Sequence, residues 1–157
     1  MKILIVEDDD DKRVQIIKFV CEDISGNYAE AKSLKTALKT IINESFDLIL
    51  LDMTMTTFDV SSGQQGGRPQ SYAGKELLLQ MARRGIRCPV IVVTQFDIFE
   101  PNGEKITLEQ LDQELYHQFP NIYLGAVHFN VKYDDWRDKI KELIKINKLN
   151  HVQDSGS

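Results

Sequence analysis

The sequence contains little cysteine and no long apolar run. Among its 157 residues there are two cysteines, Cys21 and Cys88, both in apolar surroundings, so we expect buried thiols rather than a disulfide. No stretch approaches the roughly 20 apolar residues that a membrane-spanning helix needs. The first residues, "MKILIV", lead directly into acids without the small-residue cleavage site of a signal peptide. These absences predict a cytoplasmic protein that does not bind membranes.

The chain also lacks an excess of positive charge. Its formal net charge is -5, which argues against a nucleic-acid partner because the phosphate backbone attracts concentrated lysine and arginine. The hydrophobic content of 42% and charged content of 27% are ordinary for a globular protein. A chain of this length predicts one domain with a single core.

Hydrophobic periodicity predicts alternating strands and helices. Strands are expected at Lys2–Val6, at "NYAEA", and at Phe46–Leu51, Pro89–Val93 and Tyr123–Asn130. Helices are expected at Asp9–Asp23, after an N-cap at Ser33, at Gly74–Arg84, at Leu108–Phe119 after an N-cap at Thr107, and at Asp134–Asn147. In the first of these helices, Val14, Ile17, Val20 and Cys21 recur at helical spacing and are expected to face inward. Strands this apolar must be covered on both faces. The pattern therefore predicts an α/β fold, a doubly wound five-stranded parallel sheet with right-handed crossovers.

Two segments are longer than the usual connections of such a fold. Residues 60–73 form a loop rich in Gly, Ser and Gln, and residues 95–124 contain an unusually long stretch around the fourth helix. We expect one domain over residues 1–149. The polar segment 150–157 is predicted to be a disordered tail.

Polar side chains follow four of the predicted strands. Glu7 and Asp8 follow the first strand, Asp52 the third, Thr94 the fourth and Lys132 the fifth. Ligands of open α/β sheets bind at the carboxyl ends of the strands, so we expect these groups to meet. Clustered carboxylates need a cation, and Mg²⁺ prefers such oxygen ligands.

With a metal ion bound, Asp52 has the chemistry of a nucleophile toward a phosphoryl donor, giving an aspartyl phosphate. Lys132 and the metal would hold the phosphoryl oxygens, while Thr94 offers a hydroxyl donor. The remaining acids, Asp9 to Asp11, are interpreted as a solvated helix start.

Four motifs, "ILIVEDD", "DLILLDM", "PVIVVT" and "GAVHFNVK", resemble in order the strand-end motifs of the receiver domain of two-component response regulators. The resemblance covers nearly all of Met1–Leu149 and implies a flavodoxin/CheY-like sheet with strand order 2-1-3-4-5. It implies the following roles: Glu7, Asp8, Asp52 and the Thr54 backbone carbonyl as Mg²⁺ ligands, Asp52 as phosphoacceptor, Thr94 as switch hydroxyl, Phe129 as switch aromatic, and Lys132 as the lysine that pairs with the phosphate.

The resemblance also implies a function. A receiver accepts a phosphoryl group from a sensor histidine kinase or a phosphotransfer protein and responds by changing its surface. It is not an enzyme beyond its own phosphorylation and dephosphorylation. Without a further output domain in this sequence, we expect output through protein contact at the altered fourth-helix region. A second copy of the chain is a further candidate partner.

The sequence departs from the family pattern at three places. Gln95 is bulky where a small residue usually follows the switch hydroxyl, and Tyr133 replaces the proline that usually follows the lysine. A cis bond before a non-proline residue costs about 2.5–4 kcal/mol, so we expect the Lys132–Tyr133 bond to be trans. The third departure is the pair of long segments, 60–73 and 95–124.

Two alternatives remain. The first is a degenerate receiver that binds partners without being phosphorylated. The second is a phosphotransferase of the haloacid-dehalogenase type, because "DMTMT" (Asp52–Thr56) echoes its D-x-T-x-T motif. The downstream G-D-x-x-x-D motif of that family is absent from the sequence, and Glu7 and Asp8 would have no role.

Overall fold

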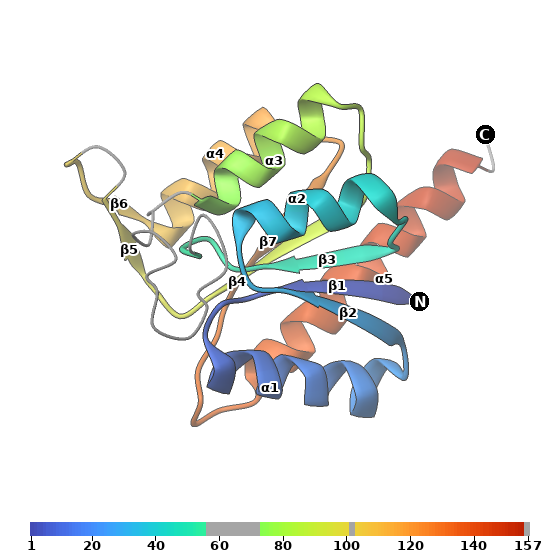
Figure 1. Cartoon of the computed structure of the whole chain (residues 1–157), viewed down its shortest axis with the longest axis horizontal. Coiled ribbons are helices and arrows are strands. Elements are labelled where there is room, and N and C mark those ends of the chain that lie inside the picture. Colours follow the sequence, from blue (N-terminus) through green and yellow to red (C-terminus); the bar gives the residue numbers. More distant parts are fainter. Residues whose placement is uncertain (56–72, 101–102, 156–157) are drawn as a thin grey trace.

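The computed structural model describes residues 1–55, 73–100 and 103–155, and its centre is a parallel sheet of five strands (Figure 1). The strands of this sheet are β1 (Lys2–Val6), β2 (Asn27–Ala31), β3 (Leu48–Leu51), β4 (Val90–Thr94) and β7 (Tyr123–His128). Their order is β2-β1-β3-β4-β7, and every pairing is parallel. Because β7 is the fifth strand of the sheet along the chain, the predicted doubly wound fold and its 2-1-3-4-5 order are confirmed.

Helices cover both faces of the sheet. They are α1 (Asp10–Phe19) with a π-helical turn η1 (Val20–Ile24), α2 (Leu34–Asn43), α3 (Ala73–Arg83), α4 (Leu108–Gln118) and α5 (Asp135–Ser155). Helices α2, α3 and α4 lie on one face, and α1 and α5 lie on the other (Figure 1). Within the described residues, no helix has the length and apolar character required to cross a bilayer.

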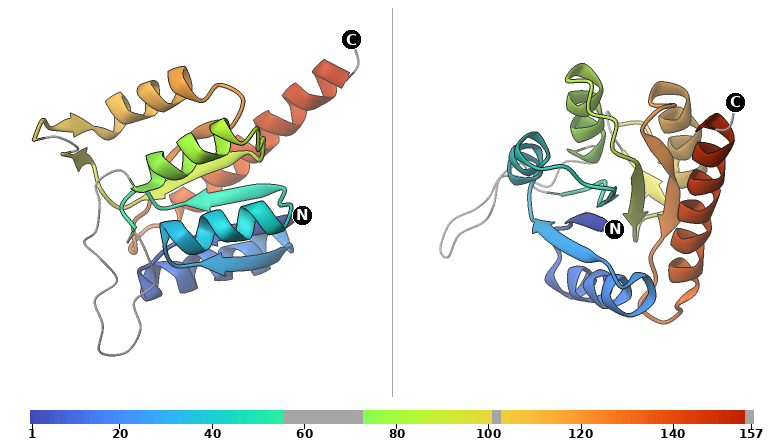
Figure 2. Two further views of the ribbon diagram at one scale, coloured as in Figure 1. Left: turned by 45° about the horizontal axis from the view of Figure 1, so that its top comes forward. Right: turned by 90° about the vertical axis from the view of Figure 1, so that its right-hand side faces the viewer.

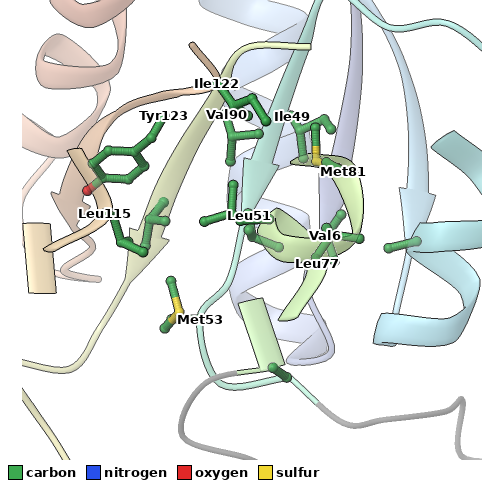
Figure 3. Close-up of a cluster of buried hydrophobic side chains, with 14 of the residues drawn as sticks. Val6, Ile49, Leu51, Met53, Leu77, Met81, Val90, Leu115, Ile122 and Tyr123 are labelled. Atoms are coloured by element: carbon green, nitrogen blue, oxygen red, sulfur yellow. The ribbon is translucent and has the colours of Figure 1, made fainter. Parts of the chain in front are cut away.

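The core divides into two layers because alternate residues of a strand point to opposite faces. In β1, Leu4 and Val6 pack under α2, α3 and α4, whereas Ile3 and Ile5 pack against α1 and α5. Figure 3 shows the first layer, with Val6 of β1 near residues of α3. This two-sided burial explains why the central strands β1, β3 and β4 are apolar along nearly their whole length, whereas the edge strand β2 is largely exposed and more polar.

The N-caps predicted for α2 and α4 are present. The Ser33 side chain accepts a hydrogen bond from the Thr36 amide, at 3.2 Å. Thr107 and Gln110 form a reciprocal capping box, in which each side chain accepts a hydrogen bond from the backbone of the other. The Asp9 side chain caps α1 by accepting from the Lys12 amide at 3.0 Å, so one acid of the initial run has a structural role.

Three sequence predictions about the helices were wrong. The last helix was expected to end at Asn147, with 150–157 disordered, but α5 continues to Ser155 and projects past the sheet (Figure 2). The sequence offers a reason, because no proline or glycine interrupts it between Asp135 and Ser155. Residues 156–157 of the predicted tail lie outside the described part of the chain. Cys21, expected to be buried, is exposed on the π-helical turn, and Cys88 is half-buried.

The third misprediction concerns the buried face of α1. Val14 was expected inward but is exposed, and the buried face instead carries Lys12, Arg13, Ile16 and Phe19. These four residues recur at helical spacing and form one buried face, in which the apolar residues Ile16 and Phe19 follow the basic residues Lys12 and Arg13.

The segment 95–124 contains a small hairpin in front of α4. Strands β5 (Ile98–Phe99) and β6 (Ile106–Thr107) pair antiparallel, and α4 begins at the next residue. The hairpin lies beyond the carboxyl ends of the sheet strands (Figure 1). Strands of two residues are too short to produce a detectable alternation, so periodicity did not predict them. Of the long loop predicted at 60–73, residues 60–72 lie outside the described part of the chain, and Ala73 begins α3.

Candidate functional site

Three carboxylates meet at the carboxyl edge of the sheet. Glu7 and Asp8 follow β1 and Asp52 follows β3, and one carboxylate oxygen of each lies within 4.8 Å of the others. The sheet brings them together because β1 and β3 are neighbours whose last residues, Val6 and Leu51, are paired. The Asp52 amide then donates to the Val6 carbonyl at 2.9 Å, which extends the pairing into the site. The structure thus unites the three acids in the way the strand ends predict.

These acids are largely removed from solvent. Glu7 is 2% exposed and Asp52 4% exposed, while Asp8 is half-buried. Burial raises the pKa of Glu7 to about 8; the nearby Lys12 lowers it, and the charges of Asp52 and Asp8 raise it further. A cluster of buried carboxylates destabilises the folded state unless cations neutralise its charge.

One such cation is already present: Lys12, which was not among the site residues predicted from sequence. The ammonium group of Lys12 lies 2.9 Å from Glu7 Oε2 and 3.4 Å from Asp52 Oδ1, and it donates a hydrogen bond to the Val93 carbonyl at 2.7 Å. Its side chain is 3% exposed. The helical spacing of Lys12 with Ile16 and Phe19 was the signal that would have placed it inward.

Lys132, the lysine predicted to join the cluster, does not do so in this structure. It lies on the exposed turn after β7, where its amide donates to the Asn130 side chain at 2.8 Å. Within the described residues its ammonium group has no ion pair with Glu7, Asp8 or Asp52. No cis peptide bond occurs in the described chain, so the Lys132–Tyr133 bond is trans.

The two predicted switch residues lie next to the site on the buried side. Thr94, the last residue of β4, is fully buried, and its hydroxyl oxygen accepts from the Phe96 amide at 3.1 Å. The Phe129 amide donates to the Thr94 carbonyl at 2.7 Å. The Phe129 ring is buried, with its centroid 5.0 Å from that of Trp136 and 5.9 Å from Lys12 Nζ. Lys12 therefore connects the acids to the switch aromatic.

A cavity of about 510 Å³ opens over the acids. Its polar side is formed by Glu7, Asp8, Asp9, Lys12, Asp52 and Thr54. The cavity is also lined by residues 95–96 and 98–100, which lead into and include β5. Gln95 is among them, and Phe96 and Ile98 are exposed apolar residues. The hairpin thus contributes apolar lining to the cavity that contains the carboxylates.

The donor set fits a hard divalent cation. It consists of carboxylate oxygens, which Mg²⁺ prefers, with Thr54 on the same cavity wall. Glu7 Oε2 is buried and pairs with the Lys12 ammonium group at 2.9 Å, so a metal ion held by Glu7 would share this carboxylate with Lys12.

A parallel sheet of this order, with acids clustered after β1 and β3, defines a receiver domain. The chain is 33% identical over 150 residues to the Detocs response regulatory protein DtcB of Enterobacter cloacae, a match that covers 93% of this chain and 100% of that protein. The chain therefore belongs to the response regulator family. A DtcB protein of Vibrio alginolyticus is 25% identical, with 91% of this chain and 99% of that protein covered. No family model matches the chain.

Solved structures agree on the fold. The response regulator protein TrrA of Thermotoga maritima, determined in complex with Mg²⁺ and BeF, has a TM-score of 0.56 at 18% identity, covering 90% of this chain and 97% of that chain. The receiver domain of a LuxO repressor protein from Vibrio parahaemolyticus has a TM-score of 0.62 at 17% identity, covering 96% and 95%. At these identities the likeness supports the CheY-like fold alone.

Proposed function

We propose that this receiver is a phosphorylation-dependent signalling switch in which Asp52 accepts a phosphoryl group from a histidine kinase or a phosphotransfer protein in the cytoplasm. The observation that carries the proposal is the position of Asp52 within the acidic cluster and on the wall of the cavity. An Asp52 carboxylate oxygen forms a bond to phosphorus, while the bond from phosphorus to the donor breaks and the donor keeps the electron pair. Membership of the response regulator family supports this chemistry.

Glu7, Asp8, Asp52 and the backbone carbonyl of Thr54 would hold a Mg²⁺ ion. The ion would neutralise charge on the transferring phosphoryl group. Mg²⁺ is the ion we propose because the donors are carboxylate oxygens and because TrrA, which has the same fold, was determined in complex with Mg²⁺ and BeF. Glu7, held by the end of β1, would also keep Asp52 at a fixed distance from the ion.

The switch would act through Thr94 and Phe129. A phosphoryl group adds about two negative charges near neutral pH, and the Thr94 hydroxyl is a donor at the neighbouring strand end. Turning that hydroxyl toward Asp52 releases its hydrogen bond with the Phe96 amide, which leads into the hairpin. We therefore place the output on the hairpin and α4, as a contact with a protein partner. The domain catalyses only its own phosphorylation and dephosphorylation.

The test is incubation with acetyl phosphate and Mg²⁺, followed by intact-mass measurement. Gain of one phosphoryl group by the native chain, and none by Asp52→Asn, is the expected result. Asp8→Asn, which removes one predicted metal ligand but leaves the acceptor, should slow the gain. A native chain that gains no phosphoryl group from acetyl phosphate or from a phosphorylated histidine donor would refute the proposal.

The second candidate is a degenerate receiver that binds partners without phosphorylation. The observation in its favour is the ion pair between Lys12 and Asp52, which occupies one oxygen of the acceptor. The same mass measurement separates the two candidates.

A further inference from the structure

We propose that Lys12, and not Lys132, is the lysine that pairs with the phosphoryl group carried by Asp52. This inference rests on the proposed function, because it concerns the same acceptor. It changes which element of the fold supplies the cation: the first turn of α1 instead of the turn after β7.

The contacts of Lys12 suit this role. Its ammonium group has three N–H donors and three oxygen acceptors around it, from Glu7, Asp52 and the Val93 carbonyl. The distances to Val93 and Glu7 are 2.7 and 2.9 Å, whereas the distance to Asp52 Oδ1 is 3.4 Å. The two short contacts fix the ammonium group beside the acceptor. The longer contact is the one that can be exchanged for a phosphoryl oxygen.

The backbone that carries Lys12 is firmly held. Asp9 caps the first turn of α1 through the Lys12 amide. The next residue, Arg13, donates hydrogen bonds to the Glu7 carbonyl at 3.2 Å and to Glu30 Oε1 at 2.9 Å. Because Glu7 follows β1 and Glu30 lies in β2, these bonds hold α1 against both strands. Lys132, by contrast, is exposed on a turn. A buried ammonium group on a fixed helix loses little freedom when it pairs with an anion.

The charge of the site requires a second cation. After phosphoryl transfer the site holds the two carboxylates of Glu7 and Asp8 and the phosphoryl group on Asp52, which together exceed the charge that one divalent ion neutralises. Developing charge in a buried site is stabilised by donors already in place. Within the described residues, Lys12 is the lysine found in ion-pair contact with Asp52. Its ammonium group also lies 5.9 Å from the centre of the Phe129 ring, so pairing with phosphate would alter the surroundings of the switch aromatic.

The test uses two matched substitutions, Lys12→Met and Lys132→Met, which remove charge while keeping an unbranched side chain. Phosphorylation by acetyl phosphate is followed by intact mass. Binding of beryllofluoride with Mg²⁺ is followed by the fluorescence of Trp136, the single tryptophan of the chain, which contacts Phe129. Loss of a charge-assisted hydrogen bond predicts that Lys12→Met weakens beryllofluoride binding about tenfold or more. Lys132→Met should bind like the native chain.

Two further measurements distinguish pairing with phosphate from a structural role. Lys12→Met should bind Mg²⁺ alone at least as tightly as the native chain, because a competing cation is removed. Lys12→Arg, which keeps the charge, should recover part of the beryllofluoride affinity. Loss of Mg²⁺ and beryllofluoride binding together would overturn the inference, as would unchanged beryllofluoride binding in Lys12→Met. If the native chain itself accepts no phosphoryl group, the proposed function fails, and this inference fails with it.

Discussion

Gly74, the second residue of α3, lies so close to Asp52 that a Cβ atom on it would be 2.9 Å from the Asp52 carbonyl oxygen and 2.9 Å from Met53 Cα. Its amide also donates to the Met53 carbonyl at 3.0 Å. Glycine is required here because both neighbouring atoms belong to the backbone and cannot turn aside. The start of α3 therefore fixes the backbone that follows Asp52, the proposed phosphoacceptor.

We predict that Gly74→Ala lowers the free energy of unfolding by about 1–3 kcal/mol, as overpacking does in other cores. Helix propensity alone predicts the opposite sign, a gain of about 1 kcal/mol. Urea denaturation followed by Trp136 fluorescence measures the difference. A variant as stable as the native chain, or more stable, would contradict the close contact.

The two cysteines should differ in reactivity. Burial raises the pKa of Cys88 to about 12, with Asp47 adding to the rise, and its thiol donates to the Phe46 carbonyl at 3.2 Å. A raised pKa leaves the reactive thiolate scarce at every pH below 12, so Cys88 should resist alkylation at pH 8. Cys21 is exposed and should react with iodoacetamide.

After treatment with iodoacetamide, intact mass should therefore show one adduct on the folded native chain and none on folded Cys21→Ser. The native chain unfolded in denaturant should carry two adducts. Equal rates of modification at both cysteines in the folded chain would show that Cys88 is not protected.

The capping box of α4 should contribute measurably to stability. Thr107→Ala removes the side-chain acceptor for the Gln110 amide and should cost about 0.5–2 kcal/mol in the free energy of unfolding. Thr107→Ser keeps the hydroxyl and serves as the matched control. If both variants unfold at the same urea concentration as the native chain, the box contributes nothing.

Gln95 should limit access to the acceptor. It lines the cavity that contains the acids, at the position where receivers usually have a small residue. Gln95→Ala should accelerate phosphorylation by acetyl phosphate, and Gln95→Leu, of similar size, should not. Equal rates for the native chain and both variants, measured by intact mass over time, would exclude a steric role.

The sheet, and the position of the three acids at its carboxyl edge, could be predicted from sequence because both depend on local patterns. Strands such as Leu48–Leu51 are apolar throughout, and a polar residue directly after such a strand is placed at the sheet edge by the strand itself. The conclusion that Glu7, Asp8 and Asp52 meet needed only the assumption that β1 and β3 are neighbours.

Local sequence patterns did not predict the positions of Lys12 and Lys132. The position of Lys12 depends on the rotation of α1 about its axis, and a lysine in a run of charged residues is usually solvated. The π-helical turn at Val20–Ile24 then changes the helical phase, which moves Cys21 outward. The place of Lys132 depends on a turn held by the Asn130 side chain. The spacing of Lys12 with Ile16 and Phe19 was the one available signal for its position, and neither the π-helical turn nor the turn at Asn130 has a signature in hydrophobic periodicity.

Thr107 belongs to two elements at once, as the last residue of β6 and the N-cap of α4. The Leu108 amide, at the start of that helix, donates to the Asp97 carbonyl just before β5, at 2.8 Å. No intervening linker is left to absorb a displacement between the hairpin and α4. A protein that docks against residues 98–100, which line the cavity over the acids, would therefore displace α4 as well. Access to Asp52 and the shape of the proposed output surface would then change together.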